Sequence, residues 1–244
     1  MAKTTPRLHV TEALADGTEI TLGAEQSHYL AHVLRLSSGD AVCLFNNENG
    51  EVLAYITTVA KKTVSLRCER QVHAVQPPPD IDYVFAPLKH QRLDYLVQKA
   101  TELGARRLQP MITARTITER VNLDRMRANV IEAAEQCNLV FVPEVLEPIA
   151  FTSLLKTWDQ NRAIIFCDET STSADPRIAL EKLKPPAAVF VGPEGGFTVE
   201  ERSLLKSMPN VAAISLGPRI MRADTAAVAA LALVQATIGD WQSR

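Results

Sequence analysis

The chain has 244 residues, of which 46% are hydrophobic and 22% charged, and its formal net charge is −2. This length suits one large domain or two small ones, and the composition is that of a soluble globular protein. The sequence contains no apolar run of the roughly 18 residues that a membrane helix needs, and its first residues lack the apolar core of a secretory signal. Four widely spaced cysteines, none in a Cys-x-x-Cys pair, argue against zinc sites and disulfides, so we expect a cytoplasmic protein without a membrane segment.

The first 73 residues are predicted to form a small β-rich domain. Short runs rich in Val, Leu, Ile and Thr at 41–46, 51–59 and 63–71 are typical of strands, and a helix is expected near 24–35. The pair Asn49-Gly50 tolerates the positive φ angles of a tight hairpin. Several short strands with one helix favour a β-barrel.

A change of pattern follows the run Pro77-Pro78-Pro79. Consecutive prolines cannot donate backbone hydrogen bonds and favour a stiff, extended connector, so we place a linker at about 74–80. Residues 80–244 are then predicted to be a second domain in which strands and helices alternate. The expected strands are 81–87, 107–112, 163–167, 187–192 and 211–216, and the expected helices are 90–104, 123–137, 177–183, 198–207 and 224–240. This alternation favours an α/β fold with a parallel sheet covered by helices on both faces.

Local charge differs from the global balance between Lys89 and Arg127. This stretch holds nine Lys or Arg and four acids, a net charge of +5. Such a stretch is compatible with a surface that faces phosphates, although a solvated helix face gives the same pattern.

Two glycine-containing segments follow predicted strands. The first, Gly192-Pro193-Glu194-Gly195-Gly196-Phe197-Thr198, leads into a helix that Thr198 and Glu201 should begin as a capping box. The second, Ser215-Leu216-Gly217-Pro218-Arg219-Ile220-Met221-Arg222-Ala223-Asp224-Thr225-Ala226, enters an Ala-rich helix. Because ligands bind beyond the carboxyl ends of strands in open parallel sheets, both segments are candidate binding loops. Neither matches a phosphate-binding loop or a dinucleotide fingerprint.

Together these segments resemble the signature of the RsmE family, the 16S ribosomal RNA (uracil(1498)-N3)-methyltransferases of the SPOUT superfamily. Further motifs match in the same order, and the resemblance covers almost the whole chain. These are His28-Tyr29-Leu30 with Val33-Leu34-Arg35, Gln98-Lys99-Ala100-Thr101-Glu102-Leu103-Gly104, and Glu132-Ala133-Ala134-Glu135-Gln136-Cys137.

The resemblance implies an N-terminal PUA-like β-barrel, a SPOUT domain with a deep trefoil knot, a homodimer, and S-adenosylmethionine (SAM) as the cofactor. It also implies that 16S rRNA in the small ribosomal subunit is the partner. The strand end Phe85-Ala86-Pro87 is expected to form a further wall of the site. The residues expected to bind the cofactor are Gly192, Glu194, Gly195, Gly196, Leu216, Gly217, Ile220, Met221, Arg222 and Thr225.

Methylation of uridine N3 requires removal of an imide proton and in-line attack on the sulfonium methyl group. We expect Arg222 to stabilise the resulting anion, and Asp224 or Glu194 to act as the base; the sequence does not choose between them. The chemistry requires no metal. The cations expected to bind RNA are Arg7, Arg35, Lys89, Arg92 and Arg115.

Two departures from the family pattern bear on these expectations. Leu139 stands where relatives commonly carry Arg, and Asp224 replaces the more usual Glu. The alternatives are a SPOUT methyltransferase with another RNA target and a ribosome-binding or assembly factor without catalytic activity.

Overall fold

The computed structural model describes residues 5–118, 120–171 and 175–242. The chain forms two compact units. The first comprises Met1–Pro77 with Ala134–Val142, and the second comprises Pro78–Ala133 with Pro143–Arg244. The units therefore meet in sequence inside the proline run expected to be a linker. Residues 134–142 pack with the first unit, which a boundary placed along the sequence alone did not anticipate.

The first unit contains a five-stranded sheet with the order β1-β3-β4-β5-β2. Its strands are β1 (Arg7–His9), β2 (Glu19–Thr21), β3 (Ala41–Asn46), β4 (Gly50–Val59) and β5 (Val64–His73). Only β1 and β3 pair in parallel. The expected helix is present as α1 (Ala24–His28), followed by a π-helical turn at Tyr29–Val33. Leu30, Leu44 and Leu66 lie in the core that the sheet and this helix enclose.

The hairpin between β3 and β4 is confirmed, but its geometry differs from a two-residue turn. Asn46 pairs with Gly50, and three residues connect them. Gly50 alone takes a positive φ, of 77°. A Cβ atom there would lie 2.3 Å from the carbonyl oxygen of His73, so the position requires glycine for space as well as for conformation.

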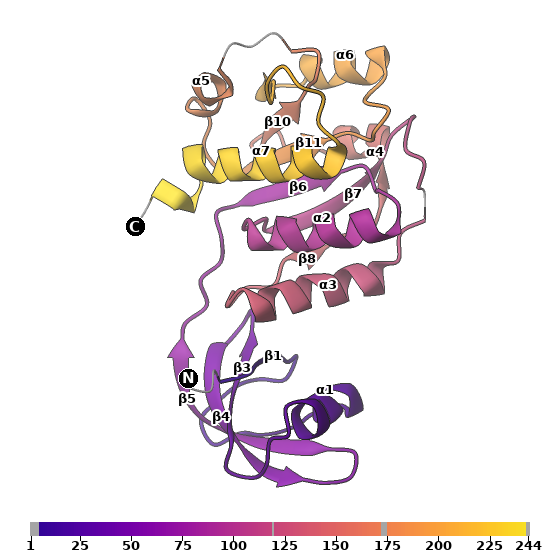
Figure 1. Cartoon of the computed structure of the whole chain (residues 1–244). Helices are drawn as coiled ribbons and strands as arrows, with labels where there is room; N and C mark the ends of the chain where they lie inside the picture. Colours follow the sequence, from indigo (N-terminus) through magenta and orange to yellow (C-terminus); the bar gives the residue numbers. More distant parts are fainter. Residues whose placement is uncertain (1–4, 119, 172–174, 243–244) are drawn as a thin grey trace. The chain divides into compact units, whose positions relative to one another are not determined.

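The second unit contains an all-parallel sheet with the order β12-β10-β11-β6-β7-β8, and β9 pairs with β7 (Figure 1). Its strands are β6 (Ile81–Phe85), β7 (Arg107–Ile112), β8 (Glu144–Val145), β9 (Ile149–Ala150), β10 (Ala163–Cys167), β11 (Ala187–Val191) and β12 (Val211–Ile214). The five longer strands are the predicted ones. The two-residue strands were not predicted because they are too short to show a period.

Helices cover both faces of this sheet, as predicted. They are α2 (His90–Glu102), α3 (Leu123–Gln136), α4 (Phe151–Lys156), α5 (Pro176–Leu180), α6 (Val199–Ser207) and α7 (Ala223–Ile238), and a short 3-10 turn at Asp240–Gln242 follows. α2 and α7 pack against each other and lie in front of the sheet in Figure 1. On the other face, Phe151 of α4 and Leu205 of α6 share a core with Phe166 and Phe190. Among the described residues, no helix is long and apolar enough to cross a membrane.

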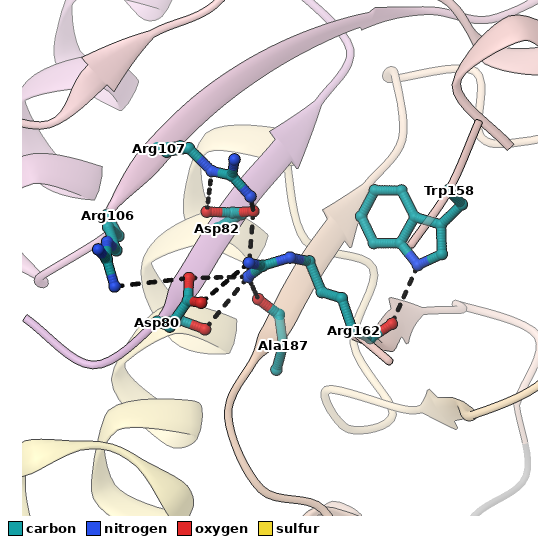
Figure 2. Close-up of polar contacts among 7 residues, drawn as sticks. All are labelled: Asp80, Asp82, Arg106, Arg107, Trp158, Arg162 and Ala187. Carbon is teal, nitrogen blue, oxygen red and sulfur yellow. Dashed lines mark hydrogen bonds and ion pairs between the residues drawn. The ribbon is translucent and has the colours of Figure 1, made fainter. Parts of the chain in front are cut away.

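A partly buried ion network joins the amino ends of the central strands (Figure 2). Arg162, just before β10, binds the carboxylate of Asp80 at 2.9 and 3.0 Å and the Ala187 carbonyl at 3.2 Å. Arg107 binds Asp82 at 2.9 and 2.6 Å. Because these residues stand at the starts of neighbouring strands, the network fixes the strands to one another at that end of the sheet.

Candidate functional site

A cavity of about 330 Å³ lies at the carboxyl ends of β10, β11 and β12, which are neighbours in the sheet. Residues 167–169 after β10, 191–196 after β11 and 214–221 after β12 line it, together with Ala223 and Ala226 of α7. The parallel sheet therefore brings the two segments singled out in the sequence to one place, at the edge where such sheets bind ligands.

The first of these segments, residues 192–196, runs close to its neighbours because it is rich in glycine. A Cβ atom on Gly192 would lie 2.7 Å from the ring of the buried Phe197. Gly196 has a φ of +66°, and a Cβ atom there would lie 2.6 Å from Oε1 of Glu169. After the loop, the Thr198 hydroxyl accepts from the Glu201 backbone N–H, and the Glu201 carboxylate accepts from the Thr198 backbone N–H. The predicted capping box is thus confirmed.

The second segment leaves β12 at Ile214, two residues earlier than predicted. Gly217 takes a φ of +106°, which turns the chain towards α7. Ile220 is 98% exposed although it lines the cavity, so a ligand that fills the cavity could cover it. Eight of the ten residues expected to bind the cofactor line the cavity: Gly192, Glu194, Gly195, Gly196, Leu216, Gly217, Ile220 and Met221.

Three expected parts of the site do not line the cavity. Arg222 and Thr225 are not among the residues that line it; both are exposed at the start of α7. Arg222 is the N-cap residue of α7. The strand end Phe85-Ala86-Pro87 is also not among the residues that line the cavity, and all three of its residues are buried.

The third wall is formed instead by Cys167, Asp168 and Glu169, which sequence reasoning missed. Burial raises the pKa of the Cys167 thiol to about 12, so this sulfur stays protonated. Burial alone would raise the pKa of Asp168, but bonds from Lys206 and Thr170 outweigh it and lower that pKa. The signal was present in the sequence: an apolar strand followed at once by two acids, at the edge where ligands bind.

Beside the cavity, Arg92 of α2 holds both carboxylates expected to serve as the base. Its Nε and Nη2 donate to the two oxygens of Asp224 at 2.8 and 3.1 Å, and its Nη1 donates to Oε1 of Glu194 at 2.7 Å. The bond from Arg92 is the main cause that lowers the pKa of Asp224. Asp224, although shorter than glutamate, reaches this arginine in a bidentate pair.

Arg92 was expected among the RNA-binding cations, and the structure shows it bound to these two acids. Its guanidinium forms three bonds to two acids, and its side chain is 32% exposed. Charge-assisted pairs of this kind are strong and fix orientation. Arg92 is therefore a part of the candidate site itself.

Arg7 is likewise committed to the protein rather than available to RNA. It pairs with Glu51, and its Nη1 and Nη2 donate to the backbone carbonyls of Ala134, Glu135 and Leu139 at 3.0, 3.1 and 2.9 Å. Only 10% of its side chain is exposed. A cation at the last carbonyls of a helix is favourable, so Arg7 caps the end of α3 within the first unit.

The basic stretch from Lys89 to Arg127 is mostly paired with acids. Ion pairs occupy Lys99, Arg106, Arg107, Arg125 and Arg127, in addition to Arg92. Lys89 is exposed, and Arg115 lies on the glycine loop, where its Nη1 donates to the Gly195 carbonyl at 2.7 Å. In the first unit, Arg35 is exposed with a φ of +55°. These three remain candidates to contact RNA.

Comparison with known proteins agrees with the geometry. Residues 76–235 match the model of an RNA methyltransferase domain, and residues 22–68 match that of an RNA methyltransferase PUA domain. Ribosomal RNA small subunit methyltransferase E of Rickettsia conorii is 33% identical over 94% of both chains, and that of Bacillus subtilis is 28% identical over 91% of this chain and 92% of its own.

Among solved structures, ribosomal RNA small subunit methyltransferase E from Neisseria gonorrhoeae, bound to SAM, is similar with a TM-score of 0.87. It is 27% identical, and the match covers 97% of this chain and 99% of that chain. The PUA-like first unit and the parallel α/β second unit are thus shared with a protein that binds this cofactor. The chain belongs to the RNA methyltransferase family that includes the ribosomal RNA small subunit methyltransferases E.

Proposed function

We propose that this protein transfers the methyl group of SAM to N3 of uridine 1498 in 16S rRNA of the small ribosomal subunit. The observation that carries the proposal is the cavity between the two family motifs, with Arg92, Glu194 and Asp224 beside it. The names of the relatives support the substrate class.

The residues of the cavity fit this cofactor. Gly195 has only the Arg115 side chain near its missing Cβ, at 3.4 Å or more, so a ligand can approach the backbone there. Apolar side chains of Val191, Ile214 and Leu216 suit an adenine ring, and carboxylates suit hydroxyl and ammonium groups. When bound, SAM supplies an electrophilic methyl group on a positively charged sulfur.

We propose Glu194 rather than Asp224 as the base. Both oxygens of Asp224 accept bonds from Arg92, and Oδ1 also accepts the Thr225 backbone N–H at 2.9 Å. Glu194 gives one oxygen to Arg92 and lines the cavity with a side chain that is 40% exposed. Its second oxygen can therefore take the N3 proton, directly or through a water molecule. Asp224 then positions Arg92.

The uracil anion formed in this step needs a cation near its carbonyl oxygens. Arg222 is exposed at the N-terminus of α7, where the helix dipole adds positive potential, and we keep it in this role. Lys89, Arg115 and Arg35 are proposed to contact RNA phosphates. Since N3 is inside a base pair in duplex RNA, the target uridine must be single-stranded or flipped out.

The family resemblance also supports a homodimer, a trefoil knot in the second unit and a location in the cytoplasm. Size measurement in solution tests the first of these. A single species of twice the chain mass of 26.8 kDa is expected.

The test of the function is transfer of radiolabelled methyl from SAM to small subunits that lack the modification, with identification of the product nucleoside. We expect 3-methyluridine at one position. Methylation of another nucleotide would replace the proposed target. SAM binding without methyl transfer to any ribosomal RNA would favour a non-catalytic ribosome-binding factor.

A further inference from the structure

The cavity wall after β10 carries an acidic side chain that methyl transfer as proposed above does not use. Glu169 lines the cavity, and half of its side chain is exposed. Its Oε1 accepts a hydrogen bond from Nη2 of Arg202 on α6. Sequence reasoning did not single out either residue.

The position of this carboxylate is fixed from two sides. On one side it lies close to the backbone of Gly196, because a Cβ atom on that glycine would be 2.6 Å from Oε1 of Glu169. The preceding residue, Asp168, is fully buried, and its carboxylate lies 2.7 Å from both Nζ of Lys206 and the Thr170 hydroxyl. Glu169 is therefore held against the glycine loop before any ligand binds, which lowers the entropy cost of binding.

A carboxylate accepts hydrogen bonds and donates none, so its ligand must be a donor. Arg202 occupies one of about four acceptor positions and balances the negative charge of Glu169. Because the charge is balanced, attraction of a ligand cation is weakened, whereas the capacity to accept from neutral hydroxyl groups remains. An acid that accepts from ribose hydroxyls is a general solution in nucleotide sites at this edge of a sheet.

From this geometry we infer that Glu169 binds the vicinal ribose hydroxyls of the cofactor. The inference rests on the proposed cofactor site. It assigns the adenosine part of the cofactor to the wall formed by Glu169 and Gly196, which leaves Glu194 on the side of the reacting methyl group. Glu169 is then a cofactor-binding residue without a role in proton transfer.

The test is calorimetric binding of two nucleosides to the wild-type protein and to Glu169→Gln. S-adenosylhomocysteine has ribose, adenine and an amino acid, whereas 5′-methylthioadenosine lacks the amino acid. If Glu169 binds the ribose, both should lose affinity by a similar factor of about 10 to 100. Glu200→Gln, which changes an exposed acid of α6 outside the cavity, should bind both nucleosides as the wild type does.

A third ligand separates direct contact from a structural role. The 3′-deoxy analogue of S-adenosylhomocysteine should bind less tightly than the parent to the wild type, but about equally to Glu169→Gln, because the partner of the hydroxyl is already gone. If removal of the 3′-hydroxyl lowered the affinity equally in the wild type and in Glu169→Gln, the inference would be overturned. So would a 5′-methylthioadenosine affinity unchanged by the substitution, which would point to the ammonium group. A wild-type protein that binds neither nucleoside would contradict the cofactor site itself.

Discussion

At the amino end of the parallel sheet, charged side chains bind one another, whereas at its carboxyl end they surround a cavity. Arg162, Asp80, Asp82 and Arg107 form a network at the strand starts (Figure 2). Arg162 and Asp82 are 10% and 6% exposed in their side chains. Here each of these charges has a partner within the protein.

At the opposite end, the charges are only partly satisfied within the protein. Arg92 joins Glu194 to Asp224, and Arg202 holds Glu169, but both glutamates line the cavity with half-exposed side chains. The same residue types thus fix strands at one end and remain open to ligands at the other. Substitutions at the two ends should therefore separate stability from activity.

The largest expected effect is on stability, from Arg162→Met at the amino end. Removal of Arg162 takes the bidentate partner from Asp80 and one of two cations from the buried Asp82, which should lower the free energy of unfolding by about 3 kcal/mol. Methyl transfer per folded molecule should not change. Arg177→Met is the matched control, because Arg177 pairs with Asp175 on the surface, and it should cost less than about 1 kcal/mol. Chemical denaturation measures both; an equal effect of the two substitutions would contradict a structural role for the network.

The same variant should change the pH dependence of stability. Arg162 lowers the pKa of Asp80 from its ordinary value of 3.8, so their pairing stabilises the protein above that pH and is lost as pH falls through the lowered pKa. The difference in unfolding free energy between wild type and Arg162→Met should therefore shrink on acidification below about pH 4. A difference that grows on acidification would contradict this assignment.

Glu194→Gln should have the largest effect on catalysis. Loss of the base should lower the rate of methyl transfer by about 100-fold or more, while the unfolding free energy changes by less than about 0.5 kcal/mol. Single-turnover kinetics on small subunits measures the rate. A rate within threefold of the wild type would assign the base elsewhere, with Asp224 the next candidate.

Arg92→Met should lower the rate of methyl transfer less, by about 10-fold, because it removes the contact that orients Glu194 but keeps the base itself. Single-turnover kinetics on small subunits measures this loss. Arg125→Met is the control, because Arg125 pairs with Asp94 on the surface. A rate equal to that of the wild type would show that the contact between Arg92 and Glu194 does not govern the reaction.

Gly196→Ala should weaken SAM binding by displacing Glu169, because its Cβ would overlap the carboxylate and its φ is positive. Gly39→Ala is a matched control: Gly39 has a φ of +91° but nothing within 4 Å of a Cβ, so only backbone strain of about 1 kcal/mol is added. If both variants bind SAM equally well, the close approach at Gly196 has no role in the site.

Sequence patterns predicted much of this molecule, and the failures have physical reasons. The five longer strands of the second unit and the two loops that line the cavity were visible from apolar runs and glycines. The strands β1 and β2 were missed because three residues show no period. Arg7 and Arg92 were expected to bind RNA because a count of charges does not show which acid each arginine pairs with. Glu51, the partner of Arg7, and Asp224, a partner of Arg92, lie 44 and 132 residues away in the sequence.

The central claim is that the cofactor occupies the carboxyl end of the sheet, and amide hydrogen exchange with and without S-adenosylhomocysteine tests it most directly. Protection is predicted in the segments 167–169, 192–197 and 215–223, with no change at the amino-end residues 80–82, 106–107 and 162. Protection centred on the amino-end network, or absent from the glycine loop, would contradict the account.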